Sequence, residues 1–304
     1  MIQSGGKIMT AKIITIIFVV LLISMESPTT TLAQHTQDMR EMKEMPMMKS
    51  DRPVAVLHCE PVDIMAGKPE TITISIKDST GKPEKGLTTT HDKIMHVVIA
   101  SRDFSVFSHI HPEDFGPITD EMKTTGQYSV RYTFPKSGRY IVGIDFGVKD
   151  WSYSKHFVID VGGGPEMGVP VQDFSLHKKF DDYDVTLTTV PESITAGKET
   201  TLIYNFAKDG TPVTDFEPYI AAFMHVAVIS TDFKQFIHEH GFVTGMPMME
   251  MGGHHMMDEM SLPSAFGPEI KVAVTFPAAG VYKIFGEVKH KGKVIVTNFM
   301  VEVK

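Results

Sequence analysis

The chain has 304 residues, of which 42% are apolar and 22% charged, a composition typical of a globular protein that is long enough for two domains. Its formal net charge of −8 argues against a nucleic-acid partner, because phosphate binding needs a basic surface. The single cysteine, Cys59, excludes an intramolecular disulfide and cysteine-rich zinc sites.

The N-terminal segment has the pattern of a secretory signal. Lys7 and Lys12 precede an apolar run over residues 13–23, and small residues around Ala33 follow at the positions that a signal peptidase reads. Because the run is short for a membrane span, we expect residues 1–33 to be a signal peptide. The protein is then secreted, periplasmic or on the outer cell surface. An uncleaved N-terminal membrane anchor is the alternative.

Residues 34–51 would begin the mature chain, and they are rich in methionine. We expect this segment to be a flexible tail outside any packed core. Its methionines include Met45, Met47 and Met48, which belong to a Met-Pro-Met-Met sequence.

An internal repeat occupies the rest of the chain. Residues 64–68 match residues 194–198 at an offset of 130, and residues 133–140 match residues 275–282 at an offset of 142. The histidines described below repeat at an offset of 129. The difference of 13 residues (142 − 129) predicts an insertion in the second repeat, at residues 245–262.

Short strands dominate both repeats. Glu70–Ile76 and Gln127–Phe134 alternate between polar and apolar residues, while Arg139–Phe146 and Lys155–Val161 are rich in β-branched and aromatic residues. About seven short strands in about 110 residues are typical of an immunoglobulin-like β-sandwich. The predicted fold is therefore all-β, with two tandem immunoglobulin-like sandwiches after the signal peptide and the methionine-rich tail.

The predicted domain boundaries follow from the repeat and from a run of glycine and proline. The first sandwich is expected at residues 52–161 and the second at residues 171–304, which includes the insertion. The Gly/Pro-rich residues 162–170 are expected to be the linker between them.

Both repeats carry the same histidine pattern. A Met-His pair is followed after twelve residues by His-x-His, with Asp-Phe midway. The candidate metal-binding histidines are His96, His109 and His111 in the first repeat and His225, His238 and His240 in the second.

Strand geometry predicts that each triplet converges on one patch. If a two-residue turn at Arg102-Asp103 joins two antiparallel strands, His96 faces His109, and His111 points to the same face two residues later. A turn at Thr231-Asp232 places the second triplet in the same way. A change of register by one residue would break this convergence.

A duplicated three-histidine pattern indicates a metal site, because imidazole is the commonest protein ligand for transition metals. We therefore expect each triplet to hold one metal ion. The alternative is a set of hydrogen-bonded histidines that hold each hairpin together.

Other residues of the hairpins have simpler interpretations. Met95 and Met224 each precede a histidine by one residue, so they point to the opposite face and are predicted to pack in the core. Asp103 and Asp232 are predicted to be turn residues. The predicted core also includes Phe104, Phe107, Phe233 and Phe236.

Two carboxylates and one thiol are further candidates. Asp145 and Glu287 match at the offset of 142, in apolar surroundings. Each could be a fourth ligand, could orient an imidazole N–H, or could be a solvated residue near a strand end. Cys59 follows His58 and is either a buried strand residue or a thiolate ligand.

The methionine-rich segments favour copper over other metals. Thioether sulfur suits Cu(I), and imidazole suits Cu(II). The insertion interleaves both ligand types, and its candidate ligands are Met246, Met248, Met249, Met251, His254, His255, Met256 and Met257. Zinc or nickel would also suit three imidazoles, and a partner-binding or oxidant-scavenging role for the methionines is the alternative.

The second histidine pattern resembles a family of exported prokaryotic proteins. In that family a Leu-x-Pro-Tyr segment leads into Gly-His, a strand, an Asp turn and His-x-His-Pro, and here the matching stretches are 215–220, 224–226 and 236–240. The first repeat keeps the sequence 109–113, His-Ile-His-Pro-Glu. The resemblance covers roughly residues 54–160 and 184–300.

This resemblance implies immunoglobulin-like sandwiches that are loosely similar to YtkA-like and periplasmic copper-resistance modules, which are often linked to heavy-metal handling. The chain departs from the pattern where Met224 replaces the usual glycine and where Gly241 replaces the proline after the second His-x-His. The insertion follows directly.

The sequence as a whole favours an extracytoplasmic metal-binding protein that chelates or delivers copper or confers tolerance to it. Its expected partners are a metal ion and another extracytoplasmic copper protein or a membrane transporter, without nucleic acid. The first alternative is a secreted immunoglobulin-like interaction module with structural histidines, and the second is a copper redox enzyme. No catalytic motif stands out, so we do not expect an enzyme.

Overall fold

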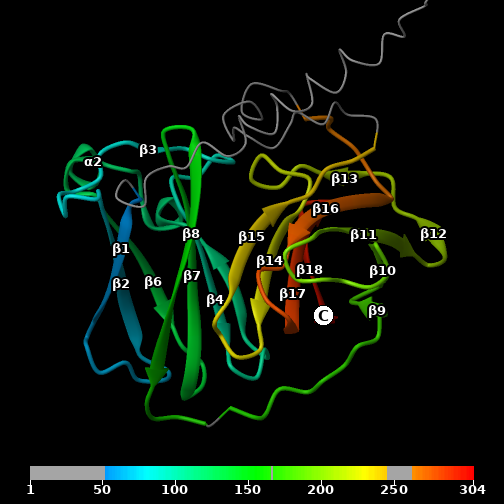
Figure 1. Ribbon diagram of the computed structural model, residues 1–304, viewed down its shortest axis with the longest axis horizontal. Helices are drawn as coiled ribbons and strands as arrows, with labels where there is room; N and C mark the ends of the chain where they lie inside the picture. The colour runs from blue at the N-terminus through cyan, green and yellow to red at the C-terminus, as the bar shows by residue number, and fades with distance from the viewer. Residues whose placement is uncertain (1–51, 166, 245–261) are drawn as a thin grey trace, which may run out of the picture. The chain divides into compact units, whose positions relative to one another are not determined.

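The computed structural model describes residues 52–165, 167–244 and 262–304 (Figure 1). The described residues of both repeats belong to one compact unit. The prediction of an all-β chain with two repeated sandwiches is confirmed. The predicted signal peptide and the predicted methionine-rich tail lie outside the described residues. The predicted insertion also lies outside them, except for its last residue.

The first repeat is a sandwich of two antiparallel sheets (Figure 1). One sheet has the order β1-β2-β6, and the other has the order β3-β7-β4-β5 with β8 also paired to β7. Two short helices, η1 and α2, lie between β5 and β6. The elements are β1 (Val54–Glu60), β2 (Pro69–Lys77), β3 (Leu87–Thr88), β4 (His96–Ser101), β5 (Phe107–Ile110), η1 (Pro112–Phe115), α2 (Asp120–Thr125), β6 (Gln127–Thr133), β7 (Gly138–Val148) and β8 (Trp151–Val161).

The second repeat has the same plan. One sheet has the order β12-β11-β10-β9 with β16 paired to β11, and the other has the order β13-β17-β14-β15 with β18 paired to β17. Its strands are β9 (His177–Phe180), β10 (Tyr183–Val190), β11 (Glu199–Lys208), β12 (Thr211–Pro212), β13 (Phe216–Glu217), β14 (His225–Ser230), β15 (Phe236–His240), β16 (Glu269–Thr275), β17 (Gly280–His290) and β18 (Lys293–Val303).

Alternating burial builds the core of each sandwich. Along β2, Ile72, Ile74 and Ile76 are fully buried between less buried neighbours, as expected for a strand with one face on the core. The repeated Thr-Phe-Pro-x-x-Gly-x-Tyr sequence also has a structural role. Tyr140 donates to the carbonyl of Lys136 at 2.9 Å, and Tyr282 donates to the carbonyl of Ala278 at 2.7 Å. Both resemble the tyrosine corner of immunoglobulin-like folds.

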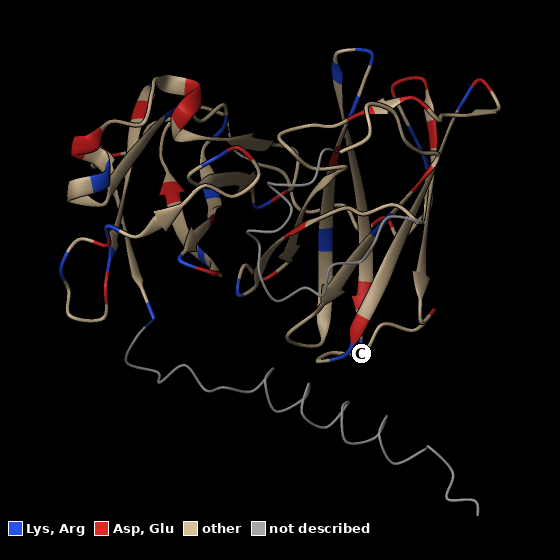
Figure 2. Cartoon of the chain, turned by 90° about the horizontal axis from the view of Figure 1, so that it is seen from above, with Lys and Arg blue, Asp and Glu red and all other residues tan. Residues whose placement is uncertain are grey.

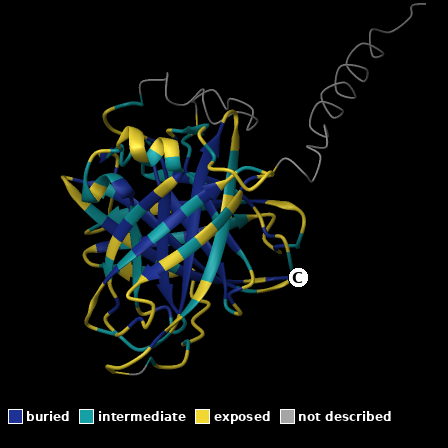
Figure 3. Cartoon of the chain, turned by 90° about the vertical axis from the view of Figure 1, so that its left-hand side faces the viewer, coloured by how far each residue is buried: buried dark blue, intermediate teal, exposed yellow. Residues whose placement is uncertain are grey.

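The two sandwiches pack on each other through β4 and β14. Every residue of both strands is buried, because one face of each strand lies on its own core and the other face meets the other repeat. Figure 3 shows the buried strands in dark blue at the centre of the fold. Charged residues gather mainly on loops and strand ends (Figure 2). A strand that is covered on both faces favours a continuous apolar sequence, and Val97–Ala100 and Val226–Ile229 are of this kind.

An apolar cluster joins the repeats, and we call it the interface cluster. Phe107 stacks on Phe285 with ring centroids 4.2 Å apart, and Phe104 meets Phe233 edge to face at 5.9 Å. The buried members are Val98, Ala100, Phe104, Ile141, Ala227, Ile229, Phe233, Phe236, Phe285 and Met300, with Phe107 and Val281 packed against them.

The predicted core residues divide between two locations. Met95 and Met224 are fully buried within their own sandwiches, as predicted. The four phenylalanines of the hairpins belong instead to the interface cluster, where Phe104, Phe233 and Phe236 are buried and Phe107 is partly buried, so their prediction as core residues was wrong about location. The sequence of a single repeat does not indicate that its outer face is covered by the other repeat.

The predicted hairpin turns were wrong by two residues in register. In the second hairpin His225 pairs with His240, and Ala227 pairs with His238. The loop has four residues in place of two, because the Asp232 carboxylate accepts hydrogen bonds from the Ser230 hydroxyl at 2.7 Å and from a loop amide. Asp103 does the same in the first hairpin, at 2.6 Å from Ser101. Both aspartates are therefore turn residues, as predicted, in a longer turn.

The convergence of the histidines survives this correction. Side chains alternate with a period of two residues, so a shift of two keeps every side chain on its predicted face. A shift of one residue would have moved His-x-His to the opposite side of the sheet.

Gly143 provides a test of the interface. A Cβ at this position of β7 would lie 2.3 Å from the Phe236 ring of the other repeat. We expect Gly143→Ala to lower the free energy of unfolding by about 1–3 kcal/mol, because the ring must leave its packed position. Chemical denaturation measures the change. Gly168→Ala is the control, since its Cβ would meet only the Asp103 carboxylate at 3.9 Å. Equal stability of the two variants would contradict the described packing.

Candidate metal centre

The two histidine triplets meet in one place. We call the six residues together the histidine cluster and each triplet a triad. Across the interface, the ring centroids of His96 and His238 are 4.8 Å apart, and those of His109 and His225 are 5.2 Å apart. One donor nitrogen from each of these four residues lies within 4.8 Å of the other three. The sequence placed the triads on separate hairpins, and the packing of β4 against β14 brings them together.

The first triad has its donor atoms already converged. His96 Nδ1, His109 Nε2 and His111 Nε2 form a triangle with sides of 3.1, 3.2 and 3.2 Å. A metal ion bonded to three imidazoles at about 2.0–2.1 Å with near-tetrahedral angles separates their nitrogens by about 3.3 Å. The triangle therefore has the dimensions of a three-histidine metal site.

The outer nitrogen of each ring in this triad is held by an acceptor. His96 Nε2 donates to the Thr90 carbonyl at 3.1 Å, and His111 Nδ1 donates to the Asp114 carboxylate at 3.1 Å. His109 Nδ1 donates to Glu287 at 2.6 Å. Because carbonyls and carboxylates accept, these contacts place a proton on the outer nitrogen of each ring.

When the three rings are neutral, three unprotonated nitrogens face one another. None of them carries a proton to donate, so their short separations are not satisfied by hydrogen bonds among themselves. A cation between them would satisfy all three lone pairs. Metal-ligating histidines ordinarily donate the other ring N–H to a carboxylate or a carbonyl, as here.

The second triad has its rings at similar spacing, with centroids 4.7–5.6 Å apart, and its donor atoms are open. His225 Nε2 donates to the Tyr219 carbonyl at 2.9 Å, which leaves Nδ1 as the acceptor. His225 Nδ1, His238 Nε2 and His240 Nε2 are all buried without a hydrogen-bond partner. These three atoms are the counterparts of the converged atoms of the first triad.

Two buried carboxylates connect the repeats crosswise. Glu287 of the second repeat accepts from His109 of the first at 2.6 Å, and Asp145 of the first repeat lies 3.4 Å from His238 Nδ1 of the second. Asp145 also accepts from Ser154 at 2.9 Å. Asp145 is 3% exposed and Glu287 6% exposed, so the alternative of solvated residues is excluded and both carboxylates lie where they contact imidazoles across the interface.

Burial favours the neutral form of five of the six histidines. Desolvation, followed by repulsion from neighbouring histidines, holds the pKa values of His96, His225 and His240 well below the usual value of 6.5. Desolvation also lowers the pKa of His238, against the opposing effect of Asp145. The pKa of His111 falls to about 3, chiefly through burial. Neutral imidazole is the form that binds metals.

The sequence patterns did not identify two residues that contact the histidine cluster, His91 and Asp114. His91 stacks on His240 with ring centroids 3.7 Å apart, and its Nδ1 donates to the Ala221 carbonyl at 3.0 Å. No sequence pattern indicates this residue, since both contacts cross the interface. Asp114, which holds His111, lies three residues after it, and that spacing could have suggested a local side-chain hydrogen bond.

The remaining candidates lie elsewhere. Cys59 is part of the first core, and burial raises its thiol pKa to about 11, so it is a protonated core residue and belongs to no metal-ligand group among the described residues. His254, His255 and the candidate methionines of the tail and the insertion lie outside the described residues.

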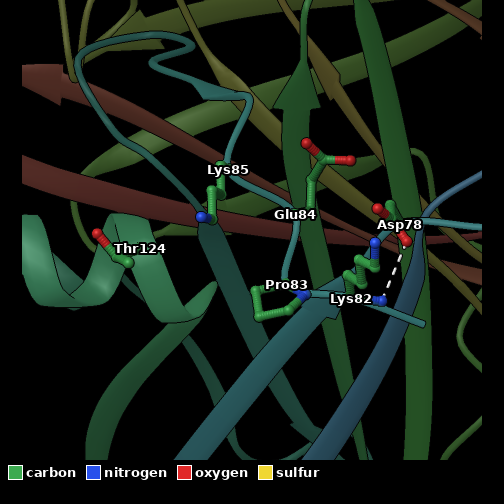
Figure 4. A pocket seen from close by; sticks show the side chains of 6 residues that line it. All are labelled: Asp78, Lys82, Pro83, Glu84, Lys85 and Thr124. Atoms are coloured by element: carbon green, nitrogen blue, oxygen red, sulfur yellow. Dashed lines mark hydrogen bonds between the residues drawn. The ribbon is translucent and has the colours of Figure 1, made fainter. Parts of the chain in front are cut away.

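A surface hollow in the first repeat does not resemble a ligand site. It is lined by Asp78, Lys82, Pro83, Glu84, Lys85 and Thr124 (Figure 4). The Asp78 carboxylate is already engaged by Thr80 and by the Lys82 amide, as part of a turn. None of the clustered histidines lines this hollow.

Comparison with known proteins gives a family. Residues 54–163 and 178–304 match a family described as "Domain of unknown function (DUF8832)". The chain belongs to this family. No curated protein matches it. The resemblance to YtkA-like and copper-resistance modules finds no support in these comparisons.

Solved structures with some likeness include domains 4 and 5 of the S-layer protein SbsC, at 12% identity and a TM-score of 0.21, covering 82% of this chain and 97% of that one. The Escherichia coli adhesin FdeC has 12% identity and a TM-score of 0.23, with 84% and 65% covered. Invasin, a bacterial integrin-binding protein, has 14% identity and a TM-score of 0.20, with 82% and 39% covered. At such low scores, these likenesses carry no inference about function.

Within residues 52–165, 167–244 and 262–304, no helix has the length and apolar character that crossing a membrane requires.

The neutral histidines predict a pH-dependent stability of the metal-free protein. Because their folded pKa values lie below the unfolded value of about 6.5, the unfolded chain takes up protons first as the pH falls. Each histidine that stays neutral then lowers the free energy of unfolding by about 1.4 kcal/mol per pH unit below that value. Glu239 has the opposite effect on stability, because burial raises its pKa to about 8 and the folded chain therefore takes up this proton before the unfolded chain does. It is one group against several histidines.

We therefore expect stability to be greatest near pH 7 and to fall between pH 6.5 and 5. Urea denaturation with a chelator present measures it. The control is the variant His58→Ala, whose missing side chain lies on the exposed face of β1 and should leave the profile unchanged. A flat profile between pH 7 and 5 would show that the cluster takes up protons in the folded state.

Proposed function

We propose that the histidine cluster is a transition-metal centre and that the chain is an extracytoplasmic metal-binding protein. One observation carries this proposal above the others. Three imidazole nitrogens converge to within 3.2 Å while the outer nitrogen of each ring donates to a carbonyl or a carboxylate. Hydrogen-bonded structural histidines would pair a donor with an acceptor at these distances.

The donor set indicates the class of metal. Buried neutral imidazoles suit copper, zinc and nickel, whereas hard cations such as Mg²⁺ and Ca²⁺ need oxygen ligands. We propose copper, because the methionine-rich tail and insertion supply thioethers that suit Cu(I). The proposed role is chelation, delivery or tolerance, with another extracytoplasmic copper protein or a membrane transporter as partner. The N-terminal signal pattern supports a location outside the cytoplasm.

An immunoglobulin-like interaction module is the second candidate. The fold supports it, because such sandwiches commonly present edges and faces to partners. The edge strand β1 also exposes Val54 and Val56, at 52% and 43%. In this case the histidines would be structural and the chain would have no strong affinity for transition metals. Fold by itself does not choose between the two candidates, since one fold serves many functions.

Metal titration separates these candidates. We expect the full chain to bind Cu(II) tightly and to lose affinity or stoichiometry in His109→Ala and in His238→Ala, because each change removes one converged donor. Calorimetry, with circular dichroism to verify folding, measures the effect. His58→Ala is the matched control on an exposed strand face. Unchanged binding in both cluster variants would refute the metal centre and leave the interaction module.

The crossed carboxylates give a second test. We expect Glu287→Gln to weaken metal binding about 10- to 100-fold, because the amide accepts less strongly from His109 Nδ1 and orients the ring less well. Competition with a chelator of known affinity measures the change. Glu302→Gln, at an exposed position of β18, is the control. Equal affinity of the two variants would show that Glu287 does not support the ligand.

A further inference from the structure

Building on the proposed metal centre, we propose that the cluster holds two metal ions side by side, one in each triad, and not one ion shared between the repeats. The two sites would form a dinuclear centre across the interface. Two features of the structure support this stoichiometry, and a third supplies an anion beside each site.

The first feature is that each triad is complete. The first triad brings three donor nitrogens to mutual distances of 3.1–3.2 Å without any atom from the second repeat. The second triad offers three buried nitrogens without hydrogen-bond partners. Three imidazoles with an open fourth position are a sufficient ligand set for copper or zinc.

The second feature is the proximity of the triads. Ring centroids within a triad are 4.6–5.6 Å apart, and those between triads include 4.8 Å for His96–His238 and 5.2 Å for His109–His225. The nearest donor atoms of the two triads lie within 4.8 Å of one another. Two ions bonded to them at about 2.1 Å are consequently no more than about 9 Å apart.

The third feature is the charge balance. A buried cation needs a nearby anion, because the interior solvates charge poorly. The structure places one buried carboxylate against a histidine of each triad, Glu287 against His109 and Asp145 against His238. Each carboxylate comes from the opposite repeat, so both repeats contribute to both sites. In the two-ion arrangement, each ion would therefore have one carboxylate beside one of its ligands.

The competing arrangement is one ion bound by His96, His109, His225 and His238. It makes a different prediction for the third histidine of each triad. His111 and His240 would be dispensable in the one-ion arrangement, whereas each is a ligand in the two-ion arrangement. These two residues therefore decide the question.

The experiment begins with the unmodified full chain. We expect equilibrium dialysis to give two tightly bound Cu(II) ions per chain at the cluster. Electron paramagnetic resonance should show dipolar broadening or loss of signal at full loading, because the two ions are close. Copper held elsewhere, for example in the methionine-rich insertion, would add an ordinary uncoupled signal, so the coupling identifies the pair without any substitution.

Variants then assign the sites. His111→Ala and His240→Ala should each remove one of the two ions and convert the coupled spectrum to that of an isolated Cu(II). His58→Ala should retain both the stoichiometry and the coupling. Circular dichroism of each metal-free variant verifies that it folds, and Co(II) absorption provides an independent count with a metal that disfavours thioether ligands.

Two results would overturn the proposal in distinguishable ways. One uncoupled ion per chain that persists in His111→Ala and His240→Ala would leave the metal centre intact but refute the dinuclear arrangement. The absence of tight binding to the full chain, with no effect of the cluster variants, would refute the metal centre itself.

Discussion

The packing of β4 against β14 is the constraint on which the rest of the structure depends. It buries both faces of each strand, and four of the six imidazoles of the cluster are buried with them. A buried imidazole stays neutral, and its N–H must find an acceptor. For five of the six rings the acceptors are the carbonyls of Thr90 and Tyr219 and three carboxylates, and in the first triad the remaining nitrogens lie within 3.2 Å of one another. The chemistry of the cluster therefore follows from the interface.

The interface also explains why two repeats are needed. Within one repeat, the triad lacks the carboxylate that orients its second histidine, because Glu287 serves His109 and Asp145 serves His238. These two carboxylate–histidine pairs relate the repeats by pseudo-symmetry, because each repeat supplies the carboxylate that contacts a histidine of the other. Next to them, the interface cluster excludes water through aromatic contacts such as Phe107 on Phe285. Apolar packing holds the two repeats in place, and this placement brings the carboxylates of each repeat into contact with the histidines of the other.

Much of the fold could be predicted from residue patterns. Strict alternation predicted β2 and β6, and the turn aspartates located both hairpins. The register was wrong by two residues because the four-residue loop depends on hydrogen bonds from Ser101 and Ser230 to those aspartates. Histidine convergence was nevertheless predicted correctly, because a shift of two residues leaves each side chain on the same face of its strand. Similarly, Met95 and Met224 each point away from the face that carries the histidines, and this prediction did not depend on the turn.

The sequence by itself determined the two sandwiches, the histidines on one face of each hairpin, and the duplication of the pattern, because these depend on local alternation along a strand. Only the tertiary structure decided that the two faces meet, that His91 joins the cluster, and that each carboxylate serves the opposite repeat. These contacts link residues up to 178 positions apart. No local periodicity records which outer face of a sandwich is covered, so the joining of two triads into one centre is a property of domain packing alone.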